Sequence, residues 1–176
     1  MEINGYKALN SDMTDNCGRK FEEGKTYHVD GELSFAATGN GFQMCKRMED
    51  SFRYIKDENS LVASVTGFGE IAESFDDHYE YYDLYVVRDI KINHLLSREE
   101  VINNILQGDE YDVCRFIITG FKLTDEEVEL IRTKFGSSDM IDKYIDYYVY
   151  GNKHAFDDGI SLMKKRNVNN GRQINN

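Results

Sequence analysis

The sequence has no long hydrophobic run, and this absence excludes a membrane-spanning protein. No apolar stretch approaches the roughly 20 residues that a transmembrane helix needs. The opening residues contain neither the basic region nor the apolar region of a secretory signal, so we expect an unprocessed cytosolic protein. With 176 residues, 40% hydrophobic and 30% charged, the chain has the composition of one ordinary soluble globular domain.

Cysteine is scarce, and phosphate-binding glycine loops are missing. Cys17, Cys45 and Cys114 form no CxxC pair, so a zinc site has little support and we predict no metal and no cofactor. A catalytic Cys–His pair stays open, because its members can lie far apart in sequence. The segments Gly39–Gly41 and Gly67–Gly69 lack the lysine of the Walker pattern and the third glycine of the dinucleotide fingerprint. We therefore predict that both segments are turns.

Basic residues are also in deficit. The chain has 32 acidic residues against 21 basic ones, a net charge of −11. Four of the basic residues lie in an acid-free tail after residue 163, so residues 1–163 carry 32 acids against 17 bases. A body this acidic repels phosphate backbones, and we therefore expect no binding of free nucleic acid.

The amino-terminal half has the short alternating segments of β-strands. These strands are predicted at Ile3–Leu9, Lys25–Val29, Leu61–Gly67 and Leu84–Ile92. Asp30-Gly31 is a two-residue hairpin turn, which predicts a returning strand at Glu32–Ala36. Apolar residues at spacings of three and four predict one helix over Gln43–Lys56.

The carboxyl-terminal half has the pattern of helices. Ser97–Glu100 and Thr124–Glu127 both fit the capping box that begins a helix, and these two helices end at Gly108 and Gly136. Two further helices are predicted, over 138–151 and 154–165. The segment 109–119 is either a helix or a strand, and its apolar spacing favours the helix. The fold class is thus α+β: a small antiparallel β-rich half with one helix (1–96), a helical half (97–165) and a disordered tail (166–176).

One candidate catalytic group lies on the predicted strand 25–29. Lys25, Tyr27 and His28 are the residue types that a metal-independent RNase uses, a histidine or tyrosine to move the proton of a 2′-hydroxyl and a lysine to stabilise the phosphate. Strand alternation places Lys25 and Tyr27 on one face and His28 on the other. A solvated hairpin edge, where lysine discourages aggregation, explains the same residues.

The segment 70–83 is the candidate partner-binding site, because it is acidic and aromatic and contains no lysine or arginine. Six acids in this segment repel one another and are suited to a basic partner, while tyrosine adds contact area. A polar loop between two strands is the competing interpretation, and a metal site at Asp76 and Asp77 lacks a third ligand. The candidate residues are Glu70, Glu73, Asp76, Asp77, Tyr79, Glu80, Tyr81, Tyr82 and Asp83.

The helical half continues this pattern. Part of its acids serve as ordinary partners of helix dipoles in first turns. The remainder, together with Tyr147, Tyr148 and Tyr150, form an acidic and aromatic face that could compete for the nucleic-acid channel of another protein.

Several pieces of the first half follow one another in a recognisable order over about residues 3–97. They are Gly5–Ala8, Asp12–Thr14, Phe21–Tyr27, Gly41-Phe42, Cys45 and Val86–Ser97. Together these pieces resemble an uncharacterised domain family carried by phages and mobile elements, which has a YK-x-F-x-x-DMT opening, then Y-E-x-GKTY, then GFH-x-C. Gln43 stands where the family usually has histidine, so no role of that histidine carries over.

A small, acidic, tyrosine-rich protein of this type is similar in character to the anti-CRISPR inhibitors. The resemblance implies a cytoplasmic inhibitor in a bacterial host that binds a type II Cas nuclease, whose guide and target lie in a positively charged channel. The alternatives are a partner-dependent RNase that truncates a guide RNA and an enzyme with an ADP-ribosyltransferase-like fold.

Overall fold

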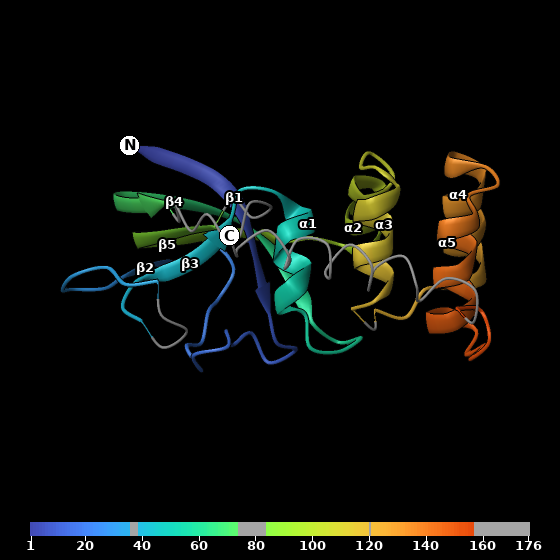
Figure 1. Cartoon of the computed structure of the whole chain (residues 1–176). Coiled ribbons are helices and arrows are strands. Elements are labelled where there is room, and N and C mark those ends of the chain that lie inside the picture. Colours follow the sequence, from blue (N-terminus) through green and yellow to red (C-terminus); the bar gives the residue numbers. More distant parts are fainter. Residues whose placement is uncertain (36–38, 74–83, 120, 157–176) are drawn as a thin grey trace, which may run out of the picture. The chain divides into compact units, whose positions relative to one another are not determined.

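The computed structural model describes residues 1–35, 39–73, 84–119 and 121–156. Contacts divide the chain into two compact units, Met1–Phe121 and Lys122–Asn176. An antiparallel sheet lies in the first unit and helices follow it in the chain, so the predicted α+β class is confirmed (Figure 1). The unit boundary follows Phe121, so the described part of the first unit includes three α-helices and a short 3₁₀ helix in addition to the sheet.

The strand pairings of the first unit close into a ring. β1 pairs with β3 and β4, β5 pairs with the same two strands, and β2 adds to β5 alone. Closure depends on the length of β4 and β5 and on two register shifts between them, which bend the pair. The strands are β1 (Glu2–Leu9), β2 (Thr26–His28), β3 (Phe42–Cys45), β4 (Leu61–Glu73) and β5 (Leu84–Leu95).

The core of this unit lies on the inner face of the ring. Alternation along β1 buries every second residue, Gly5, Lys7 and Leu9 among them. Phe21, from the loop after β1, contacts Phe42 of β3 with ring centroids 6.0 Å apart. The remaining buried members of the cluster are Met44, Ala63, Val65, Tyr85, Val87, Ile90 and Ile92.

The predicted hairpin at Asp30-Gly31 is wrong. Gly31 does turn the chain, with φ of 93°. However, β2 pairs with β5, about sixty residues away, and Glu32–Phe35 forms no strand. Instead, the Ser34 amide donates to the carbonyl of Asn40 at 2.8 Å, and the Asn40 side chain donates to the carbonyl of Asp30 at 2.6 Å. The chain therefore turns at Gly31 as its sequence predicts, but the partner of β2 in the sheet is the distant strand β5.

The predicted helix over Gln43–Lys56 is only partly confirmed. Its first residues form β3, and helix follows only as α1 (Met48–Ser51) and the short 3₁₀ helix η1 (Phe52–Tyr54). The apolar spacing that suggested one helix arises from two elements in succession, since β3 buries Phe42 and Cys45 while α1 and η1 bury Met48 and Phe52.

The predicted capping boxes are confirmed. Ser97 begins α2 (Arg98–Ile105), with its side chain accepting from the Glu100 amide, and Thr124 does the same for Glu127 in the second unit. Asp109 caps α3 (Glu110–Ile117), the helix predicted within 109–119. In the first unit, Phe116 of α3 packs on Phe52 with ring centroids 4.9 Å apart.

The second unit contains α4 (Asp125–Phe135), α5 (Asp139–Tyr144) and the π-helix η3 (Ile145–Val149). Gly136 ends α4, as predicted. The helix expected over 138–151 is present, but it widens into a π-helix midway. The helix predicted over 154–165 begins with turn residues at 154–156, and the remainder, like the tail, lies outside the described residues. None of the helices described here combines the length and hydrophobicity of a membrane span.

Candidate functional site

The three candidate RNase residues do not converge on one point. The Lys25 side chain is exposed and pairs with Glu22 at 3.8 Å. Tyr27 points to the core and contacts the Phe21 ring edge-on at 5.0 Å. His28, the next residue, projects to the opposite face and remains half exposed. A lysine, tyrosine and histidine around a single phosphate would require all three on the same side.

His28 nevertheless has a defined polar environment. Its Nδ1 lies 2.6 Å from Oδ1 of Asp89 on β5, and its Nε2 lies 3.2 Å from Oδ1 of Asp30. Both ring nitrogens must donate to satisfy two carboxylates, which only the imidazolium form does. The hydrogen bond with Asp89, followed by that with Asp30, raises the pKa of His28 above its ordinary value. His28 therefore clamps β2 to β5 in its charged form.

This clamp predicts how stability depends on pH. A histidine whose folded-state pKa is raised contributes stability that is fully present below its unfolded pKa and is lost as pH rises through the folded value. We expect the free energy of unfolding to fall as pH rises from 6.5, the ordinary histidine value, through the raised folded-state pKa of His28. The measurement is urea denaturation at a series of pH values.

Two variants test the origin of this slope. His28→Gln and Asp89→Asn should each flatten it, since one removes the titrating group and the other its principal partner. A slope that is unchanged in His28→Gln would assign the pH dependence to another group.

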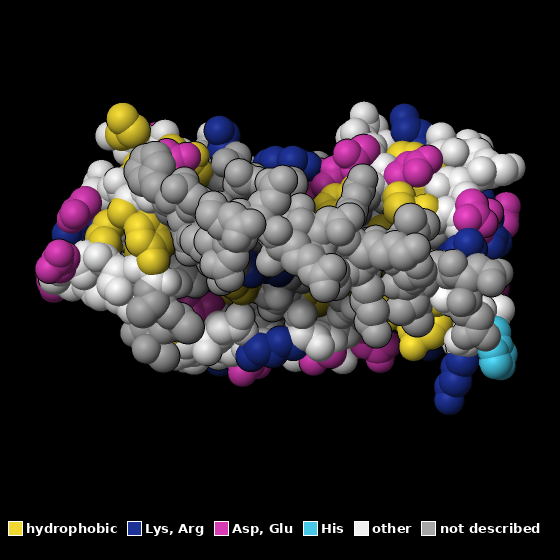
Figure 2. Space-filling view, viewed as in Figure 1, with side chains coloured by type: hydrophobic (Ala, Val, Ile, Leu, Met, Phe, Trp, Pro, Cys, Tyr) yellow, Lys and Arg dark blue, Asp and Glu magenta, His cyan; other side chains and the backbone are white. Residues whose placement is uncertain are grey.

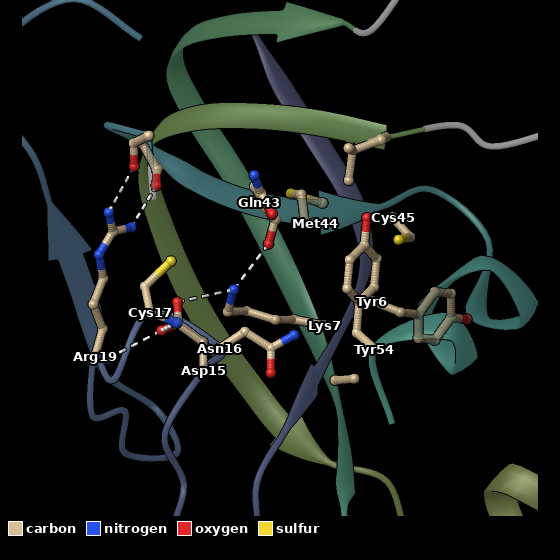
Figure 3. A pocket seen from close by; sticks show the side chains of 14 residues that line it. Tyr6, Lys7, Asp15, Asn16, Cys17, Arg19, Gln43, Met44, Cys45 and Tyr54 are labelled. Carbon is tan, nitrogen blue, oxygen red and sulfur yellow. Dashed lines mark hydrogen bonds and ion pairs between the residues drawn. The ribbon is translucent and has the colours of Figure 1, made fainter. Parts of the chain in front are cut away.

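A second polar cluster, which the sequence did not single out, lies inside the ring (Figure 3). The Lys7 ammonium is 3.3 Å from Asp15 Oδ2 and donates to the carbonyl of Gln43 at 3.0 Å. Only 7% of the Lys7 side chain and 6% of the Asp15 side chain are exposed. Burial lowers the pKa of Lys7, and the attraction of Asp15 opposes that shift. This buried ion pair joins β1, the loop after it and β3.

The loop between β1 and β2 is shaped around Asp15. Its Oδ1 accepts from the amides of Cys17 and Arg19, at 2.9 and 3.0 Å. The Arg19 guanidinium reaches across to donate to the carbonyls of Gly39 and Gly41, and it lies over the Phe42 ring at 5.2 Å. Arg19 thereby holds the start of β3 against the loop.

Upstream in the same loop, Met13 adopts the left-handed conformation with φ of 67°. This conformation is uncommon for a residue other than glycine. Asp12 supports it by accepting both the amide and the hydroxyl of Thr14, at 3.1 and 2.6 Å. The Asp-Met-Thr segment is therefore a turn that delivers the Met13 side chain to the core.

The pocket beside Lys7 has a volume of about 30 Å³. That is roughly a tenth of the smallest volumes typical of small-molecule sites. It has room for water beside the ammonium, and it is too small for a nucleotide. Its charged groups already bind one another. We therefore interpret the cluster as the internal framework of the fold.

The cysteines differ in their chemistry. Burial raises the pKa of Cys45 and that of Cys114 to about 12, so both thiols are protonated and unreactive at neutral pH. Cys17 is exposed and lines the Lys7 pocket. Within the described residues, no three His, Cys, Asp or Glu side chains are arranged to hold a metal ion.

The candidate partner-binding segment is only partly visible. Glu70 and Glu73 lie at the exposed end of β4, where Glu70 pairs with Arg88 and Glu73 accepts from the Tyr85 hydroxyl at 3.1 Å. The other seven candidates, Asp76, Asp77, Tyr79, Glu80, Tyr81, Tyr82 and Asp83, lie outside the described residues.

Lys7 was missed because a lysine in an alternating strand is usually assigned to the solvent face. The available signal was its parity, since Ile3, Gly5 and Leu9 share its side of β1. The pieces that carried the family resemblance meet around this cluster: Tyr6 pairs with Cys45 across β1 and β3, and Phe42 lies beside Phe21.

The comparisons with known proteins concern the first part of the chain. No curated protein and no solved structure matches the sequence. A family model matches residues 3–98, which include all five strands except Glu2 of β1 and make up more than half of the chain. The chain therefore belongs to the family described as Domain of unknown function (DUF7666).

Proposed function

We propose that this chain is a phage or mobile-element protein that binds and inhibits a host protein handling nucleic acid, with a guide-loaded type II Cas nuclease as the specific partner. The distribution of charge carries the proposal. Met1–Phe121 contains 23 acids against 12 lysines and arginines, whereas Lys122–Asn176 contains nine of each. The whole net charge of −11 therefore belongs to the first unit.

A negative unit of this kind associates faster with a basic channel, because opposite charges steer the encounter. The acidic side chains of the described residues are scattered on the visible face (Figure 2). The densest acidic stretch in the sequence is 70–83, which begins at the exposed end of β4. We assign the principal contact to this segment.

The deciding experiment is a single gel. The purified chain is incubated with a guide-loaded type II Cas nuclease, labelled guide and labelled target. Blocked target cleavage with an intact guide supports inhibition by binding. Blocked cleavage with a shortened guide supports an RNase. Normal cleavage rejects the Cas partner.

Reversing charge in the acidic segment tests the contact directly. We expect Asp76→Lys combined with Asp77→Lys and Glu80→Lys to weaken partner binding by roughly 10- to 100-fold, mainly through slower association. The wild-type affinity should also fall with added salt, since exposed charges are screened beyond about 8 Å at physiological ionic strength. Binding kinetics on immobilised partner measure both effects.

A matched control separates the segment from the net charge. Glu32→Lys, Glu58→Lys and Glu99→Lys change three exposed acids of the same unit by the same total charge. This variant should retain most of the affinity. Equal weakening by the two triple variants would assign binding to the overall charge and reject the segment as the contact.

His28 is the one observation that favours the RNase alternative. It is half exposed, and its carboxylate partner Asp89 orients the ring, while the Nε2 atom would have to exchange Asp30 for the RNA. In this alternative, the partner delivers the guide RNA to His28. His28→Ala should then abolish guide shortening and leave partner binding unchanged.

A further inference from the structure

The second unit exposes the three tyrosines of the aromatic face expected from the sequence, although α-helical spacing by itself would bury one of them. Regular α-helical spacing would place Tyr148 on the buried stripe with Ile141, Tyr144 and Ile145. The helix instead widens at η3, and Tyr148 is 49% exposed. π-helical turns are rare and frequently occur at functional sites. Tyr147, Tyr148 and Tyr150, hereafter the tyrosine face, are all exposed.

The rings of the tyrosine face are held in place before any partner arrives. Tyr147 and Tyr148 contact each other with centroids 4.8 Å apart, and Tyr147 contacts Phe156 at 5.1 Å. The buried Tyr144 supports both Tyr148 and Phe156, at 5.8 and 5.1 Å. Ordered aromatic rings lose little conformational entropy on binding.

Carboxylates lie beside Tyr150, one member of this face. The Tyr150 hydroxyl donates to Asp125 at 3.3 Å. Close by, a single guanidinium, that of Arg132, meets three carboxylates, those of Asp142 at 3.0 Å, Glu129 at 3.7 Å and Asp146 at 3.9 Å. Negative charge therefore remains in excess at this point. Asp142 and Asp146 also line an open hollow of about 530 Å³.

We propose that the tyrosine face and its neighbouring carboxylates form a docking surface for an arginine-bearing segment of a partner protein. Arginine stacks on tyrosine rings and binds carboxylates with its planar fork of donors, so one side chain uses both features. Arg132 shows the carboxylate part of this recognition within the chain. The inference rests on the proposed function for the basic character of the partner. Single-stranded RNA is disfavoured, because its phosphates would meet the same carboxylates.

The test uses the full chain with tyrosine rings isotopically labelled for NMR. The probes are an arginine-rich peptide, the matched lysine-rich peptide and a single-stranded RNA oligonucleotide. We expect the arginine peptide to shift the resonances of the tyrosine face and to bind about ten-fold more tightly than the lysine peptide. Tyr147→Leu with Tyr148→Leu should weaken arginine-peptide binding about ten-fold. Tyr111→Leu, a similarly exposed tyrosine of the first unit, should leave it unchanged.

Two results would overturn the docking surface. One is equal affinity for the two peptides with no loss in the double variant. The other is movement of the same resonances by RNA and not by the arginine peptide. The peptide titration contains no nuclease, so it tests the docking surface separately from the Cas partner. Binding of the arginine peptide together with normal target cleavage in the gel assay would reject the Cas partner and retain the docking surface. Blocked target cleavage without binding of the arginine peptide would reject the docking surface and retain the Cas partner.

Discussion

Lys7→Met should destabilise the protein by about 3–5 kcal/mol, the cost of leaving one member of a buried ion pair without its counterion. The methionine fills most of the space of the lysine stem, so the cavity contribution is small. What remains is the Asp15 carboxylate, only 6% exposed and deprived of its ammonium. The amides of Cys17 and Arg19 still donate to it, which limits the loss. Urea denaturation at neutral pH measures the difference.

Lys25→Met is the matched control. Lys25 is 63% exposed, and its pair with Glu22 spans 3.8 Å. Exposed pairs of this kind contribute about 0–1 kcal/mol, so the control should unfold close to the wild type. Lys7→Met could also unfold at the same urea concentration as the wild type. In that case the free-energy cost of burying the Lys7 ammonium equals the stabilisation from its pairing with Asp15, and the cluster adds no net stability.

Gly5→Ala should produce the second large effect, a loss of about 3 kcal/mol or detachment of β3. A Cβ at position 5 would overlap the carbonyl oxygen of Cys45 and lie 2.6 Å from the Met44 methyl group. The methionine has other rotamers, but the carbonyl belongs to the strand that faces β1 at the Tyr6–Cys45 pair. Relief therefore requires the two strands to separate.

Gly18→Ala separates steric overlap from the general cost of replacing glycine. Gly18 has φ of 77°, and an added Cβ there meets nothing within 4 Å. Only the left-handed conformation opposes alanine, at about 1–2 kcal/mol. Thermal unfolding followed by circular dichroism compares the variants. Equal losses would show that β1 and β3 are less closely apposed than the structure places them.

Whether an element of this fold could be predicted depends on how far apart in the sequence its interacting residues lie. The capping boxes at Ser97 and Thr124 were predictable, since both partners lie within four residues and the hydrogen bonds need no other part of the fold. The strands β1, β4 and β5 were predictable for a related reason. Alternation of apolar and polar residues indicates a strand with one buried face, whichever part of the protein covers that face.

The errors concern segments whose structure depends on distant partners. Residues after Gly31 had the local chemistry of a hairpin, yet β2 gains its hydrogen bonds from β5. Likewise, Phe42–Cys45 had helical spacing but lies as a strand between β1 and β5. A local pattern carries no information about which remote strand has unsatisfied backbone groups, and those groups decide the competition.

By itself, then, the sequence determined the α+β class, the helix starts at Ser97 and Thr124, the principal strands and the excess of acid, because each follows from neighbouring residues or from composition. Only the tertiary structure decided that Lys7 lies inside with Asp15, that His28 meets Asp89, and that the helix widens into a π-helical turn around Tyr148. Each of these depends on closure of the ring or packing of helices, which brings together residues whose pairing has no local signature.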